Sequence, residues 1–190
     1  MAVKTGDHVR NGVDTSVLFA TLDAVKGQPE LAKFQFRARN MWIAGAHNRA
    51  TMRDFYGAGH EDTSRATAFV IDAGEPGVLL GADTGPNPAE ISLSALSACL
   101  TTSLVYSAAA RGVRLSRVES TLEGDIDLRG ALGLSEEVRN GFEAIRVTFR
   151  VEGDAPPDKL REVVTQGQRR SAVFDTLSHG VPISVDVITG

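Results

Sequence analysis

The sequence predicts an α+β domain with an antiparallel sheet, because its strand-like segments come in groups and do not alternate one by one with helices. Three such segments precede a long helical segment, a pair follows it, and helices and a final strand close the chain. The predicted order is βββ-α-ββ-α(α)-β. The 190 residues fit one domain with an extension, and a hydrophobic content of 42% allows a sizeable core.

The first predicted element is a short helix before the strands. Asp14 or Thr15 can cap it, and Gly27 and Pro29 end it. The apolar residues on its single apolar face are Val17, Leu18, Leu22 and Val25. We expect residues 1–32 to form an N-terminal extension and residues 33–190 to form the main domain.

The first strand group is indicated by alternating apolar residues and by glycine-containing turns. We expect strands at residues 34–42, 51–55 and 66–71, and residues 78–80 are expected to extend or follow the third.

The long helix is expected from residue 88 to residue 111, closed by Gly112. Asn87 suits the N-cap position, Pro88 the first helical position, and Glu90 the positive end of the helix dipole. About 24 residues at 1.5 Å each give a helix of roughly 36 Å, long enough to be the central element. Its apolar stripe consists of Leu93, Leu96, Leu100 and Leu104.

The second half of the chain predicts an antiparallel strand pair and two helices. The strands are expected at residues 118–128 and 142–151, and the helices at 157–170 and 171–177. Gly180 ends the second helix, and Ile183, Val185 and Val187 form a predicted last strand.

Composition excludes several classes of function. A net charge of −4 from 20 basic and 24 acidic residues favours neither nucleic acid nor an anionic membrane as partner. No apolar run is long enough to span a membrane. One cysteine with four scattered histidines gives no metal-ligand spacing and no disulfide framework, and it fits a reducing cytoplasm. Phosphate-loop, GxSxG and HExxH motifs are absent from the sequence.

The single cysteine, Cys99, lies in the middle of the predicted long helix. It is either a small buried apolar residue or a nucleophile that receives outside help. Its position denies it the N-terminus of its own helix, so a reactive thiol would need a cation from elsewhere in the fold. Glu90 is nine residues away, about two and a half turns and about 13 Å along the axis, and cannot contact it through the helix. Without a template, Glu90 and the arginines 37, 39, 49 and 53 are solvated charges.

Four segments of the chain resemble the OsmC/Ohr family. Residues 85–90 (Gly-Pro-Asn-Pro-Ala-Glu) and 94–100 (Ser-Ala-Leu-Ser-Ala-Cys-Leu) resemble its first signature. Residues 170–177 (Arg-Ser-Ala-Val-Phe-Asp-Thr-Leu) with 180–185 resemble its second, and residues 122–128 and 142–151 resemble its middle strands. The likeness covers roughly residues 34–188.

The resemblance implies an intertwined homodimer with shared active sites that reduce organic hydroperoxides. Cys99 takes the place of the attacking cysteine. Arg49, four residues after the glycine of Trp42-Ile-Ala-Gly45, takes the place of the activating arginine, and Glu90 that of the acid that orients it. In the Ohr branch that glutamate falls one residue earlier, at Ala89 of this chain.

The chain departs from the family at the resolving cysteine, whose place is occupied by Ser171. A serine hydroxyl is hardly ionised at neutral pH and does not resolve a sulfenic acid, so a two-thiol cycle within one chain is impossible. Two functions stay open: a one-cysteine peroxidase that needs an external thiol, and a non-catalytic protein that binds a small apolar ligand in the dimer-interface pocket. No cofactor or metal is expected.

Overall fold

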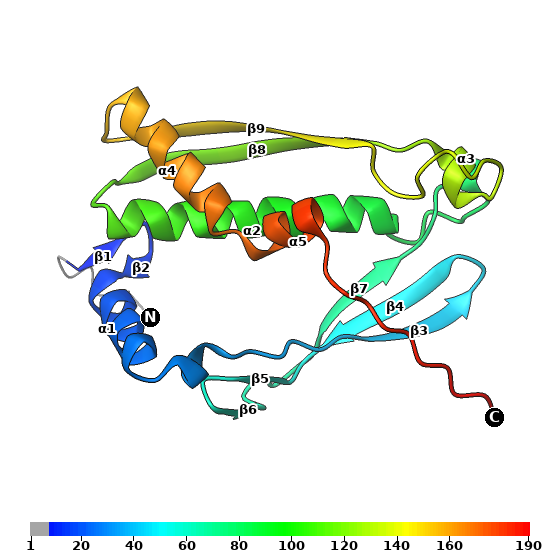
Figure 1. Ribbon diagram of the computed structural model, residues 1–190, viewed down its shortest axis with the longest axis horizontal. Helices are drawn as coiled ribbons and strands as arrows, with labels where there is room; N and C mark the ends of the chain where they lie inside the picture. The colour runs from blue at the N-terminus through cyan, green and yellow to red at the C-terminus, as the bar shows by residue number, and fades with distance from the viewer. Residues whose placement is uncertain (1–7) are drawn as a thin grey trace. The chain divides into compact units, whose positions relative to one another are not determined.

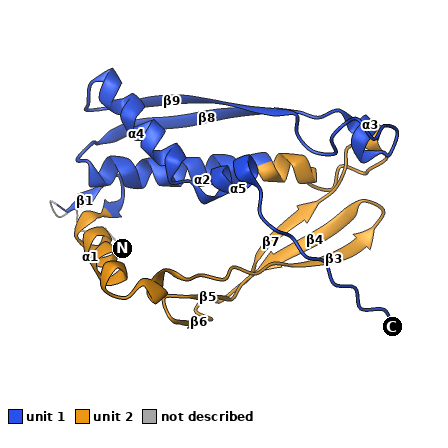
Figure 2. Ribbon diagram, viewed as in Figure 1, with its two compact units in different colours: residues 1–13, 93–190 blue, residues 14–92 orange. Residues whose placement is uncertain are grey.

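The structure is a computed structural model that describes residues 8–190, and it separates into two units (Figure 2). Unit 1 contains the residues up to 13 together with residues 93–190, and unit 2 contains residues 14–92. The predicted division into residues 1–32 and 33–190 stays a prediction.

The long helix and the strand pair predicted after it form most of unit 1. Helix α2 spans Pro88–Ala110, so all but its first turn belongs to this unit. Strands β8 (Leu115–Asp125) and β9 (Ala144–Gly153) form an antiparallel hairpin, and α2 runs along it (Figure 1). The other elements of unit 1 are β1 (Val9–Arg10), α3 (Leu128–Ala131), α4 (Pro157–Arg169) and α5 (Ala172–His179). Strand β2 (Val13–Asp14) pairs with β1 and lies at the boundary between the units.

The core of unit 1 lies between α2, α4 and the β8–β9 hairpin. Its buried residues are Leu104, Ala108, Val113 and Val163, with Val118, Phe149 and Val151 packed against them. Helix α4 lies directly against α2 at Gly167, where an added Cβ would lie 2.7 Å from Leu104 Cα. That contact requires glycine, and it determines how α4 and the following α5 are held against α2.

Helix α2 is also long and apolar enough to cross a membrane by length and composition alone. The core helix of a folded domain passes the same test, and the α2 residues Leu96, Leu100 and Leu104 are buried against the rest of unit 1. We therefore describe α2 as a core helix.

Unit 2 contains helix α1 and the first strand group. Helix α1 (Thr15–Gly27) is capped by Asp14, as predicted, and a 3₁₀ turn, η1 (Pro29–Ala32), follows. The three-stranded antiparallel sheet has the order β3-β4-β7, made of β3 (Arg39–Ala44), β4 (His47–Met52) and β7 (Phe69–Ala73). Between β4 and β7 the chain forms a short hairpin of β5 (Phe55–Gly57) and β6 (His60–Asp62). A second 3₁₀ turn, η2 (Gly77–Leu79), follows β7.

The structure confirms the α+β class and the fold of the resembled family. Several elements differ locally from the predicted ones. Residues 34–38 are not a strand, apart from a single bridge between Gln35 and Tyr56. Residues 78–80 are not a strand either, because the segment curls into η2 with Leu80 in the left-handed region at φ 63°. Gly81 folds back so closely on Glu75 that an added Cβ would lie 1.7 Å from its carbonyl oxygen.

The predicted last strand is the largest difference. Residues 180–190 form no strand, and Ile183, Val185 and Val187 are at least 80% exposed. A strand exists only where it can exchange backbone hydrogen bonds with a neighbour. In the described part of this single chain no strand edge pairs with the segment.

Candidate functional site

Cys99 lies on α2, half-buried, against the start of α5. Ser171 is the N-cap of α5, and its Oγ accepts a hydrogen bond from the backbone N–H of Phe174 at 3.2 Å. The Ser171 side chain also hydrogen-bonds the Cys99 sulfur. At 2% exposure Ser171 is shielded from water, so it holds the first turn of α5 and the sulfur in one fixed arrangement.

Hydrogen bonds set the acidity of the Cys99 thiol. Burial by itself raises its pKa, but hydrogen bonds outweigh this and place the pKa below its ordinary value. The donors are the Ser171 hydroxyl, the backbone N–H groups of Val173 and Ala172, and the Ser103 hydroxyl. The unpaired N–H groups at a helix start carry partial positive charge and stabilise a thiolate.

Neutral hydrogen-bond donors therefore lower the pKa of Cys99 without a cation among them, and the expectation that a reactive Cys99 needs a cation stays a prediction. Cys99 is in the middle of its own helix, but it faces the N-terminus of another one. The residue that replaces the resolving cysteine, Ser171, is thus in direct contact with Cys99. The assignment of Ser171 to the place of the resolving cysteine stays a prediction, and the sequence gave no sign that Ser171 would donate a hydrogen bond to the Cys99 sulfur.

Arg49 belongs to a second cluster, in unit 2. It lies on β4 directly opposite Asp72 on β7. Arg49 Nε and Nη2 donate to the two Asp72 carboxylate oxygens at 2.9 and 3.1 Å, and His47 Nε2 lies 2.9 Å from Asp72 Oδ1. Hydrogen bonds from Arg49 and then from His47 hold the pKa of Asp72 below its usual range. The carboxylate therefore stays ionised and fixes the orientation of the guanidinium.

Glu90 serves a different purpose in this structure. The backbone N–H of Asn87 donates to Glu90 Oε2 at 2.8 Å, and the N–H of Glu90 donates to Asn87 Oδ1 at 3.0 Å. This reciprocal pair is a capping box at the start of α2. Asn87 Nδ2 in turn donates to Glu75 at 3.1 Å. The acid that holds Arg49 is therefore Asp72 and not Glu90. The sequence alone does not identify Asp72, because its position opposite Arg49 depends on the register between β4 and β7.

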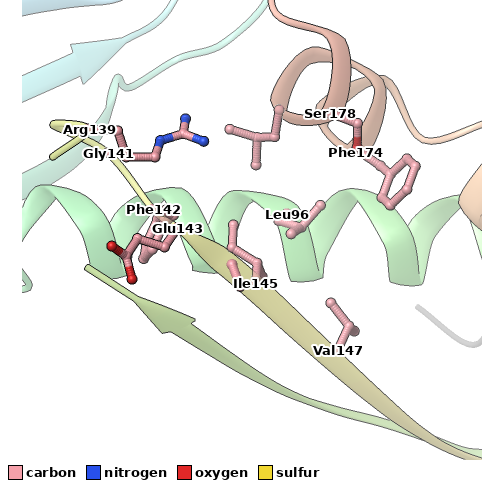
Figure 3. A pocket seen from close by; sticks show the side chains of 11 residues that line it. Leu96, Arg139, Gly141, Phe142, Glu143, Ile145, Val147, Phe174 and Ser178 are labelled. Carbon is pink, nitrogen blue, oxygen red and sulfur yellow. The ribbon is translucent and has the colours of Figure 1, made fainter. Parts of the chain in front are cut away.

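An apolar cavity of about 420 Å³ lies in unit 1 between α2, β9 and α5 (Figure 3). Phe174, in the first turn of α5, and Leu96, one turn before Cys99 on α2, both line it. The other lining residues are Arg139, Gly141, Phe142, Glu143, Ala144, Ile145, Val147, Leu177 and Ser178. A second cavity of about 350 Å³ shares Ile145, Val147 and Phe174 with the first. The Cys99 helix therefore has apolar space beside it for a small molecule.

Within residues 8–190 no group of three or more His, Cys, Asp or Glu side chains could hold a metal ion.

Comparison with known families decides the relationship. Residues 81–186, which contain both Cys99 and Ser171, match the family model of the OsmC-like protein. The chain belongs to the OsmC-like protein family. Arg49 and Asp72 lie outside the matched range. A comparison with curated proteins found no match.

Solved structures of OsmC-like proteins share this fold. An OsmC-like protein from Mycoplasma pneumoniae is similar with a TM-score of 0.59 and 14% identity, over 76% of this chain and 88% of that one. An organic hydroperoxide resistance protein OsmC from Legionella pneumophila has a TM-score of 0.52 and 15% identity, over 77% and 90%. An organic hydroperoxide resistance protein from Elizabethkingia anophelis has a TM-score of 0.50 and 14% identity, over 76% and 89%. At these identities the likeness shows the fold alone.

Proposed function

We propose that this OsmC-like protein is a thiol-dependent peroxidase that reduces organic hydroperoxides with Cys99 alone. The observation that carries the proposal is the Cys99 thiol at the start of α5, where four hydrogen bonds favour its ionised form. A thiolate is the nucleophile in peroxide reduction, and a cysteine kept only for packing needs no such donors.

The reaction has two stages. The Cys99 thiolate attacks the terminal oxygen of R–O–O–H, so that an S–O bond forms, the O–O bond breaks, and the alkoxide leaves and takes a proton to become an alcohol. Cys99 is then a sulfenic acid. An external thiol converts it to a mixed disulfide with release of water, and a second external thiol frees the Cys99 thiol as a small disulfide leaves. Ser171 cannot replace the external thiol, and its hydroxyl serves instead to stabilise the thiolate.

Arg49 is proposed to contribute to thiolate stabilisation, as the family resemblance implies, with Asp72 as the acid that orients it. The support is the pair of hydrogen bonds between Arg49 and Asp72, together with the alanine, Ala89, in the place of the Ohr-branch glutamate. We expect Arg49→Gln and Asp72→Asn to slow the oxidation of Cys99. Glu90→Gln is the matched control, because glutamine preserves a capping box, and its rate stays that of the wild type. If Glu90→Gln slowed oxidation and Asp72→Asn did not, Glu90 would be the orienting acid.

A cytoplasmic homodimer is part of the proposal. Large apolar side chains are exposed in the single chain, among them Trp42 at 72% and Phe69 at 63%. Five more lie near the C-terminus: Val181, Ile183, Val185, Val187 and Ile188. Exposed apolar surface of this kind is typical of interaction surfaces. Light scattering on the purified protein tests this, and a monomer at micromolar concentration would contradict it.

The decisive experiment exposes the reduced protein to cumene hydroperoxide and measures intact mass. We expect a gain of one oxygen atom at Cys99 within minutes, reversed by excess thiol, and no gain in Cys99→Ser. An unmodified Cys99, with equal peroxide consumption by both proteins, would contradict the proposal.

The cavity between α2, β9 and α5 favours a second candidate function, non-catalytic binding of a small apolar ligand (Figure 3). Native mass spectrometry distinguishes the two. A copurified ligand together with an inert Cys99 would support binding without turnover.

A further inference from the structure

One wall of the Figure 3 cavity carries the cationic side chain of Arg139. Within residues 8–190, Arg139 forms no hydrogen bond and no ion pair, although it lines the cavity. Several other arginines of unit 1 have carboxylate partners, such as Asp127 for Arg129 and Asp125 for Arg146. Arg139 is therefore free to bind a ligand.

The backbone at Arg139 is held in place. Gly130 of α3 packs against this segment, and an added Cβ there would lie 2.5 Å from the Val138 carbonyl oxygen and 2.7 Å from that of Arg139. The Phe142 ring, part of the same wall, lies over Gly124 of β8, where a Cβ would come within 2.3 Å of it. Two glycines thus position the cationic residue and one aromatic wall of the cavity.

Most of the other side chains that line the cavity are apolar, and the cavity is large enough for a small ligand. Leu96, Ile145, Val147 and Phe174 form its walls, and its volume of about 420 Å³ lies within the range of known ligand sites, roughly 300–1,000 Å³. At about 30 Å³ for each water-sized group, that volume holds on the order of 14 such groups. A chain of about ten carbon atoms with a polar head is of matching size.

The charge on the cavity wall indicates which polar head group the cavity would bind. A guanidinium offers two parallel N–H donors that match a carboxylate. Glu143 also lines the cavity, and in Figure 3 its carboxylate and the Arg139 guanidinium point in different directions. A single negative charge balances Arg139, whereas a phosphate monoester, with nearly two charges, exceeds that balance and is repelled about twice as strongly by Glu143 as a carboxylate is.

We propose that this cavity binds an aliphatic carboxylate, with its head on Arg139 and its chain along Leu96, Ile145 and Phe174. The inference goes beyond peroxide reduction, since binding requires neither an oxidant nor the Cys99 thiol.

Calorimetric titration of the Cys99→Ser protein with sodium decanoate and with 1-decanol tests the proposal without redox chemistry. We expect decanoate to bind about tenfold more tightly than decanol, equivalent to about 1.4 kcal/mol. Arg139→Gln is expected to abolish that difference by weakening decanoate alone. Arg169→Gln, which removes an exposed arginine that does not line the cavity, keeps it. Ala144→Trp fills the cavity and weakens both ligands.

Equal affinities of the two ligands for Cys99→Ser would overturn the proposal, as would absence of decanoate binding. The comparison of decanoate with decanol uses only the Cys99→Ser protein, so it still tests the proposal if a cavity variant fails to fold. Unchanged decanoate affinity in a folded Arg139→Gln protein would also overturn it. A peroxidase that fails this test remains a peroxidase, and a decanoate binder with an inert Cys99 remains a binder.

Discussion

Replacing Ser171 with alanine removes one oxygen atom that has two functions. That oxygen accepts from the Phe174 N–H at 3.2 Å as the N-cap of α5, and the same hydroxyl donates to the Cys99 sulfur. Loss of a serine N-cap costs about 1 kcal/mol. For a chain of this length that corresponds to a fall in Tm of roughly 2–4 °C, which differential scanning calorimetry resolves.

The same substitution changes the reactivity of Cys99. The Ser171 hydrogen bond is the foremost of those that lower the pKa of the thiol, so the pKa of Cys99 rises when the hydroxyl is removed. At a given pH less thiolate is present, and the rate of alkylation by iodoacetamide falls. The pH profile of alkylation moves to higher pH.

Ser171→Gly separates the two functions. Glycine costs only a few tenths of a kcal/mol at an N-cap, so its Tm stays close to that of the wild type. It has no hydroxyl, however, and its alkylation profile is expected to move as far as that of Ser171→Ala. If both variants alkylate with the wild-type profile, the assignment of Ser171 as a thiolate donor is wrong.

Three other predictions concern neighbouring parts of unit 1. Ser171→Cys places a thiol beside Cys99, and peroxide then yields an internal disulfide, seen by intact mass as the loss of two hydrogens; a persistent sulfenic acid would contradict the contact. Gly167→Ala forces a Cβ to within 2.7 Å of Leu104 Cα, and such overpacking costs about 1–3 kcal/mol in urea unfolding; an unchanged midpoint would show that the helices separate freely. Asp127 has its pKa lowered to about 2 by the neighbouring arginine side chain and backbone N–H, against about 3.9 when unfolded. Its contribution to stability is complete above the unfolded pKa and is lost as pH falls through the folded pKa, so Asp127→Asn is less stable than the wild type near neutrality, and the difference closes only below pH 2.

Elements defined by local signals were predicted well from the sequence. Asn87, Pro88 and Gly112 mark the ends of α2 by their own backbone preferences, and β8 and β9 are sequence neighbours that pair with each other. The strand expected at Ile183–Val187 was wrong for the described chain, because a strand depends on a partner that the local pattern does not contain.

The residues of the candidate site likewise differ in whether local sequence signals identify them. Resemblance identified Cys99 and Ser171, but their contact joins distant parts of the chain through the packing of α4 on α2, which no local pattern encodes. Asp72 is identified as the partner of Arg49 only from the register between β4 and β7, which places the two residues opposite each other. Glu90 shows the converse, since its local role at the start of α2 was foreseen and is confirmed.

The donors around Cys99 within unit 1 have a consequence for ionic strength. All of those that lower its pKa are hydroxyls or backbone N–H groups without net charge, in direct contact with the sulfur. Dissolved ions screen charges separated by more than about 8 Å at physiological salt, and they do not enter a hydrogen bond. The lowering of the Cys99 pKa by the hydrogen bonds from α5 is therefore expected to persist in concentrated salt. Any lowering of that pKa by a distant guanidinium would become smaller. Salt thus distinguishes the dipoles of this helix from the charge of an arginine without altering a single residue.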